Sequence, residues 1–137
     1  MLRVVMILLV GMLAINVGIV QAENNISVNT MPPAVVKTFP QAGDTSVDPS
    51  IKEIRVTFSK DMMTQEMWSW VIVSKESFPQ IVGDVGYLND KRTCAAPVKL
   101  EAGKTYAIWF NSVKYNAFRD KNNNPAIPYL LVFQTRE

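Results

Sequence analysis

After residue 31 the sequence is a succession of short apolar runs, each ended by turn-forming residues, and no stretch holds a helical period beyond one or two turns. In the clearest run, residues 54–58, apolar Ile54, Val56 and Phe58 alternate with polar residues, which is the period of a half-buried strand. Turns recurring at about every 8–12 residues are typical of an antiparallel β-sandwich of about seven strands. The expected strands cover residues 34–39, 54–58, 68–74, 81–88, 92–100, 106–110 and 129–135, and residues 60–66 are expected to form one helical turn.

The first 22 residues have the pattern of a secretory signal peptide. Arg3 supplies the positive charge, residues 4–20 are almost wholly apolar, and Val20-Gln21-Ala22 places small residues where a signal peptidase cuts. An uncleaved membrane anchor is the alternative, although the apolar run is shorter than the roughly 20 residues that span a bilayer. The sequence therefore predicts a signal peptide over residues 1–22, a linker over 23–31 and one domain over 32–137, exported to the periplasm, the cell surface or the medium.

The composition excludes several kinds of chemistry. The chain of 137 residues has no histidine, which removes imidazole bases, Ser–His or Cys–His nucleophile pairs and His-ligated metal sites. One cysteine removes an intrachain disulfide and a zinc cluster, and a net charge of +2 gives no basic stripe for nucleic acid. We therefore expect a protein that is not an enzyme, needs no cofactor and does not bind nucleic acid.

The order of the turn, strand and corner residues is similar to that of a known family. The stretches that carry this likeness are Pro32-Pro33 to Val36, Pro40-x-x-Gly43-x-x-x-Val47-Asp48-Pro49, Ile54 to Ser59 with Met62, Leu100-Glu101-Ala102-Gly103-Lys104-Thr105-Tyr106, Asp120 to Pro125, and Leu131 to Thr135. Together they resemble the bacterial Ig-like domain of the S-layer (SbsA) type over about residues 32–135. The resemblance implies an Ig-like sandwich, whereas Asn124 in place of a glycine, the Trp68-Ser69-Trp70 segment and Cys94 depart from the family pattern.

The residues of 92–106 include several that are expected to have structural roles. Tyr106 follows Leu100 by six residues with Gly103 between them, a spacing that fits a tyrosine corner in which the hydroxyl bonds to backbone upstream. Cys94 shares its parity with the apolar residues of 92–100, so we expect it to face the core. Pro97 has the other parity, and its missing N–H favours an edge strand.

Two groups of residues are candidate metal ligands. Met62, Met63 and Met67 form a cluster of thioethers, which are ligands for Cu(I), although core packing by methionine is the alternative. Asp120, Asn122 and Asn124 place oxygen side chains at alternate positions, as a calcium loop begins, but turn formation explains them equally well.

The tryptophans are the candidate binding residues. If residues 106, 108 and 110 point inward, Trp109 points outward. Trp68 and Trp70 share one face of their strand, while valines occupy the other, so this strand is apolar on both faces. Either a loop covers one of these faces or it forms an exposed patch.

These observations favour an exported, non-catalytic module with a structural or interaction role in the cell envelope. Its partner would be an envelope protein or a glycan, and a membrane only if residues 1–22 are not cleaved. A periplasmic metal-binding protein, using the methionine cluster or the Asp120 loop, is the alternative.

Overall fold

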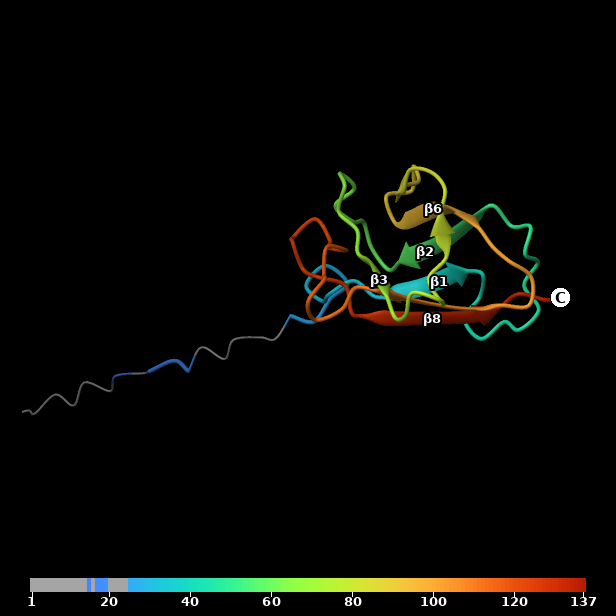
Figure 1. The fold of residues 1–137 in the computed structure, drawn as a ribbon. Helices are drawn as coiled ribbons and strands as arrows, with labels where there is room; N and C mark the ends of the chain where they lie inside the picture. The colour runs from blue at the N-terminus through green and yellow to red at the C-terminus, as the bar shows by residue number, and fades with distance from the viewer. Residues whose placement is uncertain (1–14, 16, 20–24) are drawn as a thin grey trace, which may run out of the picture.

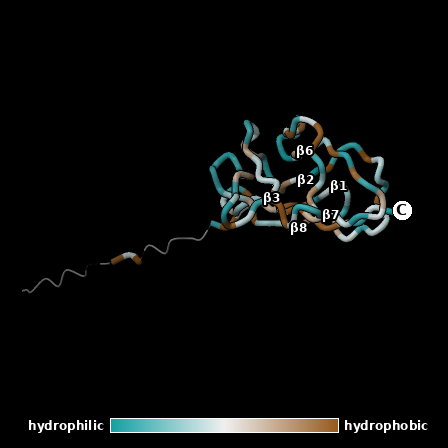
Figure 2. Tube along the Cα trace, viewed as in Figure 1, coloured by the Kyte–Doolittle hydropathy of each residue, from teal (hydrophilic) through white to brown (hydrophobic). Residues whose placement is uncertain are grey.

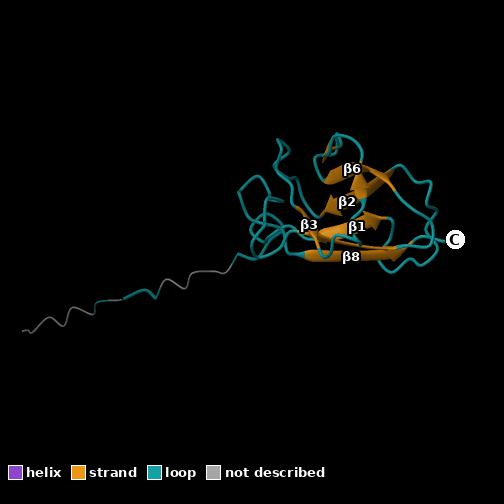
Figure 3. Ribbon diagram, in the orientation of Figure 1, coloured by secondary structure: helices purple, strands orange, loops and turns teal. Residues whose placement is uncertain are grey.

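The computed structural model describes residues 15, 17–19 and 25–137, and this part of the chain contains strands and loops but no helix (Figures 1 and 3). One sheet is formed by β1 (Val35–Phe39), β2 (Glu53–Phe58), β6 (Thr93–Lys99) and two short strands, β4 (Gln80–Ile81) and β5 (Gly86–Tyr87). The other is formed by β3 (Trp70–Ile72), β7 (Thr105–Phe110) and β8 (Tyr129–Gln134). All neighbouring strands of the two sheets are antiparallel, so the predicted all-β antiparallel sandwich is confirmed.

The strand order is that of an Ig-like sandwich. The orders β1-β2-β6-β4 and β3-β7-β8 correspond to the two sheets of the constant-type Ig arrangement. Ile81 lies opposite Val98, and Gly86 lies opposite Ala95, so β4 and β5 are two halves of one broken strand along β6. The break explains why the described residues form eight strands where the sequence predicts about seven.

The core lies between the two sheets and follows the predicted alternation. Ile54, Val56 and Phe58 of β2 are 0%, 0% and 1% exposed. They face Ile108 and Phe110 of β7, which are also fully buried. Figure 2 shows the resulting alternation of hydrophobic and hydrophilic segments along the chain. Burial of each of these large side chains contributes about 1.5–3 kcal/mol relative to exposure, so β2 and β7 are the centre of the fold.

Tyr106 ties the start of β7 to the preceding loop. Its ring is buried and stacks on Phe133 of β8 at 5.4 Å, and its hydroxyl accepts a hydrogen bond from the Glu101 N–H at 2.8 Å. Leu100 is buried beside it, and Gly103 takes a φ of +63°, a conformation that favours glycine. This is the geometry of a tyrosine corner.

Two local predictions are wrong. Residues 60–66 do not form a helical turn, because Met62 is extended and bridges to Asp120. Pro97 is not on an edge strand, because β6 lies between β2 and the β4–β5 strand. Its carbonyl accepts from the Val82 N–H at 2.9 Å, at the break between β4 and β5. A proline therefore occupies an inner strand at the place where its neighbour is interrupted.

The N-terminal end of the described chain is attached to the sandwich. Residues 25–31 lie at the end of the sandwich opposite the C-terminus (Figure 1). The Lys60 ammonium donates to the carbonyls of Asn29 and Met31, both at 3.0 Å, so this part of the predicted linker contacts the domain. The predicted cleavage site after Ala22 and most of the predicted signal peptide lie outside the described residues. In the part that is described, no helix is long and apolar enough to span a membrane.

Candidate binding surface

The outward-facing side of the β3-β7-β8 sheet carries rows of apolar side chains. The strand register places Val71, Trp109 and Leu130 side by side across the three strands, because Trp109 is opposite both of the others. Ala107 and Val132 are opposite one another in the next row on the same side. We call these five residues the outer face.

The outer face is accessible and uncharged. Leu130 and Val132 are 39% and 36% exposed, Val71 and Trp109 are half-buried, and Ala107 is nearly covered. Thr105 and Gln134 end the surface, with the Gln134 amide donating to the Thr105 hydroxyl at 2.9 Å. Such a surface can bury apolar area against a partner, and it contains no group that could act as an acid, a base or a nucleophile.

The three candidate tryptophans do not lie in one patch. Trp109 belongs to the outer face, whereas Trp70 points between the sheets and packs edge-on against Phe110 with ring centroids 4.9 Å apart. Trp68 is half-buried and packs against the same core cluster. The side chains of Trp68 and Trp109 therefore lie on opposite sides of the β3-β7-β8 sheet.

A groove runs along the free side of β3, between the two sheets. Its lining includes Trp68, Trp70, Phe78, Ile81, Val85 and Tyr115. Ile72 also lines it and is 56% exposed, although it lies on the core-facing side of its strand. No described strand therefore fills the space between β3 and the β4–β5 strand.

Cys94 is buried beside Trp70. The thiol is 0% exposed, and burial raises its pKa to about 12, a rise that the Trp70 indole N–H only partly opposes. The Trp70 Nε1 atom has no hydrogen-bond partner among the described residues. Burial likewise raises the pKa of Tyr87, which neighbours the thiol. Cys94 is thus a protonated core residue rather than a reactive thiol.

The three candidate copper-binding methionines do not converge. Met62 is 1% exposed and lies in the core, and its N–H donates to the Lys91 carbonyl. The Met63 N–H donates to the Arg119 carbonyl, and consecutive residues of an extended chain point their side chains to opposite sides. Met67 is half-buried further along the chain. Core packing explains Met62, and nothing in this arrangement favours a Cu(I) site.

In the Asp120 loop the aspartate carboxylate is paired with the ammonium group of Lys60. Asp120 Oδ1 accepts from the Asn122 and Asn124 N–H groups at 2.9 Å, and Oδ2 lies 2.8 Å from the Lys60 Nζ atom. The same ammonium donates to two backbone carbonyls, those of Asn29 and Met31. Its partners are therefore oxygen atoms, as the ligands of a calcium ion would be. Burial raises the pKa of Asp120, but Lys60 and the Asn124 and Asn122 donors together lower it below its ordinary value. In the described ranges no cluster of three or more His, Cys, Asp or Glu residues could hold a metal ion. The geometry gives the calcium hypothesis no support.

Comparison with known proteins identifies the family. The model of a bacterial Ig-like domain family, Big_5, matches residues 29–135, which is most of the chain. The chain belongs to the bacterial Ig-like domain family. No curated protein and no solved structure gave a significant match. The narrower S-layer type suggested by the sequence motifs stays a prediction.

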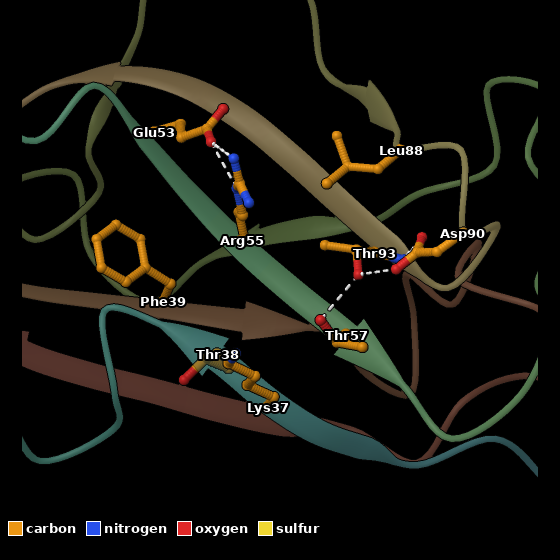
Figure 4. A pocket seen from close by; sticks show the side chains of 9 residues that line it. All are labelled: Lys37, Thr38, Phe39, Glu53, Arg55, Thr57, Leu88, Asp90 and Thr93. Atoms are coloured by element: carbon orange, nitrogen blue, oxygen red, sulfur yellow. Dashed lines mark hydrogen bonds and ion pairs between the residues drawn. The ribbon is translucent and has the colours of Figure 1, made fainter.

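The opposite sheet of this Ig-like domain carries a polar depression, which sequence reasoning did not single out (Figure 4). The Thr57 and Thr93 hydroxyls lie 2.9 Å apart, and Thr93 donates to Asp90 at 2.6 Å. Arg55 pairs with Glu53 on its own strand. These polar groups already bind one another, so a ligand entering the depression would compete with them.

Three further residues that shape the Ig-like domain are not indicated by the sequence alone. Lys60 is 8% exposed, and its carboxylate partner lies 60 positions further along the chain, so no local pattern signals the pair. Leu130 and Val132 alternate with buried residues of β8, and this parity could have placed them outward. Their position beside Trp109 required the β7–β8 register.

Proposed function

We propose that this Ig-like domain is an exported, non-catalytic module of the bacterial cell envelope, which binds another envelope protein through its outer face. The observation that carries the proposal is the pair of apolar rows on the outward side of the β3-β7-β8 sheet. Domains of this family occur typically in extracellular or surface proteins and are generally non-catalytic, which supports both the location and the class of function. The predicted signal peptide supports export.

The chemistry of the outer face favours a protein over a glycan. Sugars are held by hydrogen-bond donors and acceptors placed around an aromatic ring, whereas Trp109 has Val71 and Leu130 as its neighbours across the sheet. The polar side chains closest along the strands, Thr105 and Gln134, bond to one another. An apolar protein surface satisfies such a face without leaving polar groups unpaired.

The aromatic ring at the middle of the face is the expected anchor of the contact. Trp109 is half-buried and has an apolar neighbour on each side, a position in which truncation of a tryptophan commonly costs 2 kcal/mol or more of binding, about 30-fold in affinity. Trp109→Ala should therefore weaken binding about 30-fold or more, by the same conversion, without unfolding the core, since the indole faces away from it.

Site-specific photo-cross-linking in the native bacterium tests the proposal. A benzophenone side chain at Leu130 is compared with one at Arg55, an exposed position on the other sheet. We expect one defined cross-linked protein from position 130, lost on Trp109→Ala, and none from position 55. Equal cross-linking from both positions, or none from position 130, would contradict the proposal.

A further inference from the structure

One edge of the β3-β7-β8 sheet is open. The Asn111 N–H donates to the Ser69 carbonyl at 3.1 Å, so along this register Val71 and Trp109 form the hydrogen-bonded pair. The main-chain N–H and C=O groups of Trp70 and Ile72 consequently point away from β7. Among the described residues no strand pairs with β3 on that side.

The other sheet edges are closed or interrupted. The outer edge of β8 is covered by residues 43–47, with the Gly43 and Val47 N–H groups donating to the Val132 and Gln134 carbonyls. The edge strand β1 contains an irregularity between Val35 and Lys37, and the β4–β5 edge is broken in the middle. Bulges, lysines, breaks and covering loops are the devices that prevent edge-to-edge association. β3 is short but has none of these other devices.

The side chains along β3 fit an apolar strand. The edge sequence Trp70-Val71-Ile72 is uncharged, and so are all the residues that line the adjoining groove. Ile72 is 56% exposed on the core-facing side of the sheet, where one more strand would cover it. An extended apolar segment beside β3 would therefore both pair with the free backbone groups and cover the groove.

We propose that this segment is β3 of a second copy of the chain, paired antiparallel about a two-fold axis at Val71. Trp70 of one copy would exchange both main-chain hydrogen bonds with Ile72 of the other, giving about four bonds in total. On the groove side, Ile72 of each copy would pack against Trp70 of the other. On the outward side, Val71 would meet its equivalent.

The charge pattern favours a second copy as the occupant. In a two-fold interface a residue on the axis meets its own equivalent, and a residue beside the axis meets a different residue of the second copy, so an edge that carried charges of one sign would repel itself. The edge and its groove lining carry none. Pairing would also join two outer faces into one row, Leu130-Trp109-Val71 followed by the same residues of the second copy, and so double the apolar surface offered to a partner. β3 is only three residues long, whereas a standard interface has roughly 20–30 residues on each side, so we expect weak and transient association.

Disulfide trapping in the purified, exported protein tests the proposed register of β3 against β3 of the second copy. In a non-hydrogen-bonded antiparallel pair the Cα atoms are about 4.5 Å apart, within the span of a disulfide. Val71→Cys should form a covalent dimer on mild oxidation, whereas the matched variant Leu130→Cys, two strands from the edge, should form far less. Native Cys94 adds little background because it is 0% exposed.

Sedimentation equilibrium tests the association without cross-linking. The wild-type protein should dimerise with rising concentration, Ile72→Lys should weaken dimerisation at least tenfold by placing ammonium groups near the axis, and Val132→Lys should leave it unchanged. A wild-type protein that stays monomeric up to about 1 mM, a free energy of association weaker than about 4 kcal/mol, would overturn the proposal. Equal trapping of the two cysteine variants would overturn it too, as would cross-linking of Cys-substituted position 71 to a different protein, which would assign the edge to a foreign strand.

Discussion

Lys60→Met is predicted to destabilise the domain more than any exposed charge substitution would. The Lys60 ammonium lies 2.8 Å from Asp120 and 3.0 Å from the carbonyls of Asn29 and Met31, and the Lys60 and Asp120 side chains are 10% and 1% exposed. Methionine keeps the length and apolar stem of lysine but removes the charge. The substitution therefore leaves a buried carboxylate whose countercharge is gone.

The structure sets the size of the effect. Breaking a buried ion pair by removing one partner costs about 3–5 kcal/mol, because the remaining charge stays desolvated. Asp120 keeps its N–H donors from Asn122 and Asn124, which places the expected loss at the lower end, about 3 kcal/mol. A domain of this size has a free energy of unfolding of about 5–15 kcal/mol, so the loss is a large part of the total.

Urea unfolding followed by tryptophan fluorescence measures this loss. Lys121→Met is the matched control, because Lys121 also contacts an aspartate, Asp61 at 3.2 Å, but its side chain is 58% exposed, and removing it should leave the free energy of unfolding nearly unchanged. Adding Asp120→Asn to Lys60→Met should recover at least half of the loss, since no unpaired charge remains. Equal stability of the Lys60→Met and Lys121→Met variants, or no recovery in the double variant, would show that the buried Lys60–Asp120 pair does not stabilise the domain.

Other expected outcomes concern single groups. Tyr106→Phe should lower the free energy of unfolding by about 1–3 kcal/mol, because the Glu101 N–H loses its hydroxyl partner, and an unchanged urea midpoint would contradict the tyrosine corner. The pKa of Asp120 is lowered in the folded state, so its stabilisation is present above about pH 4 and is lost as the pH falls through the folded value. The free energy of unfolding, measured with urea at decreasing pH, should therefore fall less steeply for Asp120→Asn than for wild type. Parallel curves of this free energy against pH would contradict the prediction. Cys94 should resist a thiol reagent in the native protein at pH 8 and react fully in urea, whereas fast native labelling would contradict its burial.

The sequence alone predicts those strands in which apolar and polar residues alternate. Alternation in residues 54–58 and 106–110 identified β2 and β7 and their inward faces, because each inward residue meets the same core. The helical turn predicted for residues 60–66 is wrong, since their polar and apolar spacing fits one helical turn as well as it fits an extended segment. The competing contacts, from the Met62 and Met63 N–H groups to the Lys91 and Arg119 carbonyls, are distant in sequence and leave no local pattern.

The candidate surface was predictable only in part for the same reason. Parity alone indicated that Trp109 points outward, and the structure places it so. Grouping it with Trp68 and Trp70 required knowing on which side of β3 each lies, which depends on pairing with β7. Leu130 and Val132 became part of the surface through the β7–β8 register, which no single strand specifies.

We propose that a partner in the envelope covers the outer face of this domain. Leu130→Cys and Arg55→Cys variants, treated with a membrane-impermeant maleimide both in intact cell envelopes and as purified protein, test it most directly. We expect both positions to react in the purified protein, and in the envelope we expect position 55 still to react while position 130 is protected. Equal labelling of the two positions in the envelope, or labelling of neither, would contradict it.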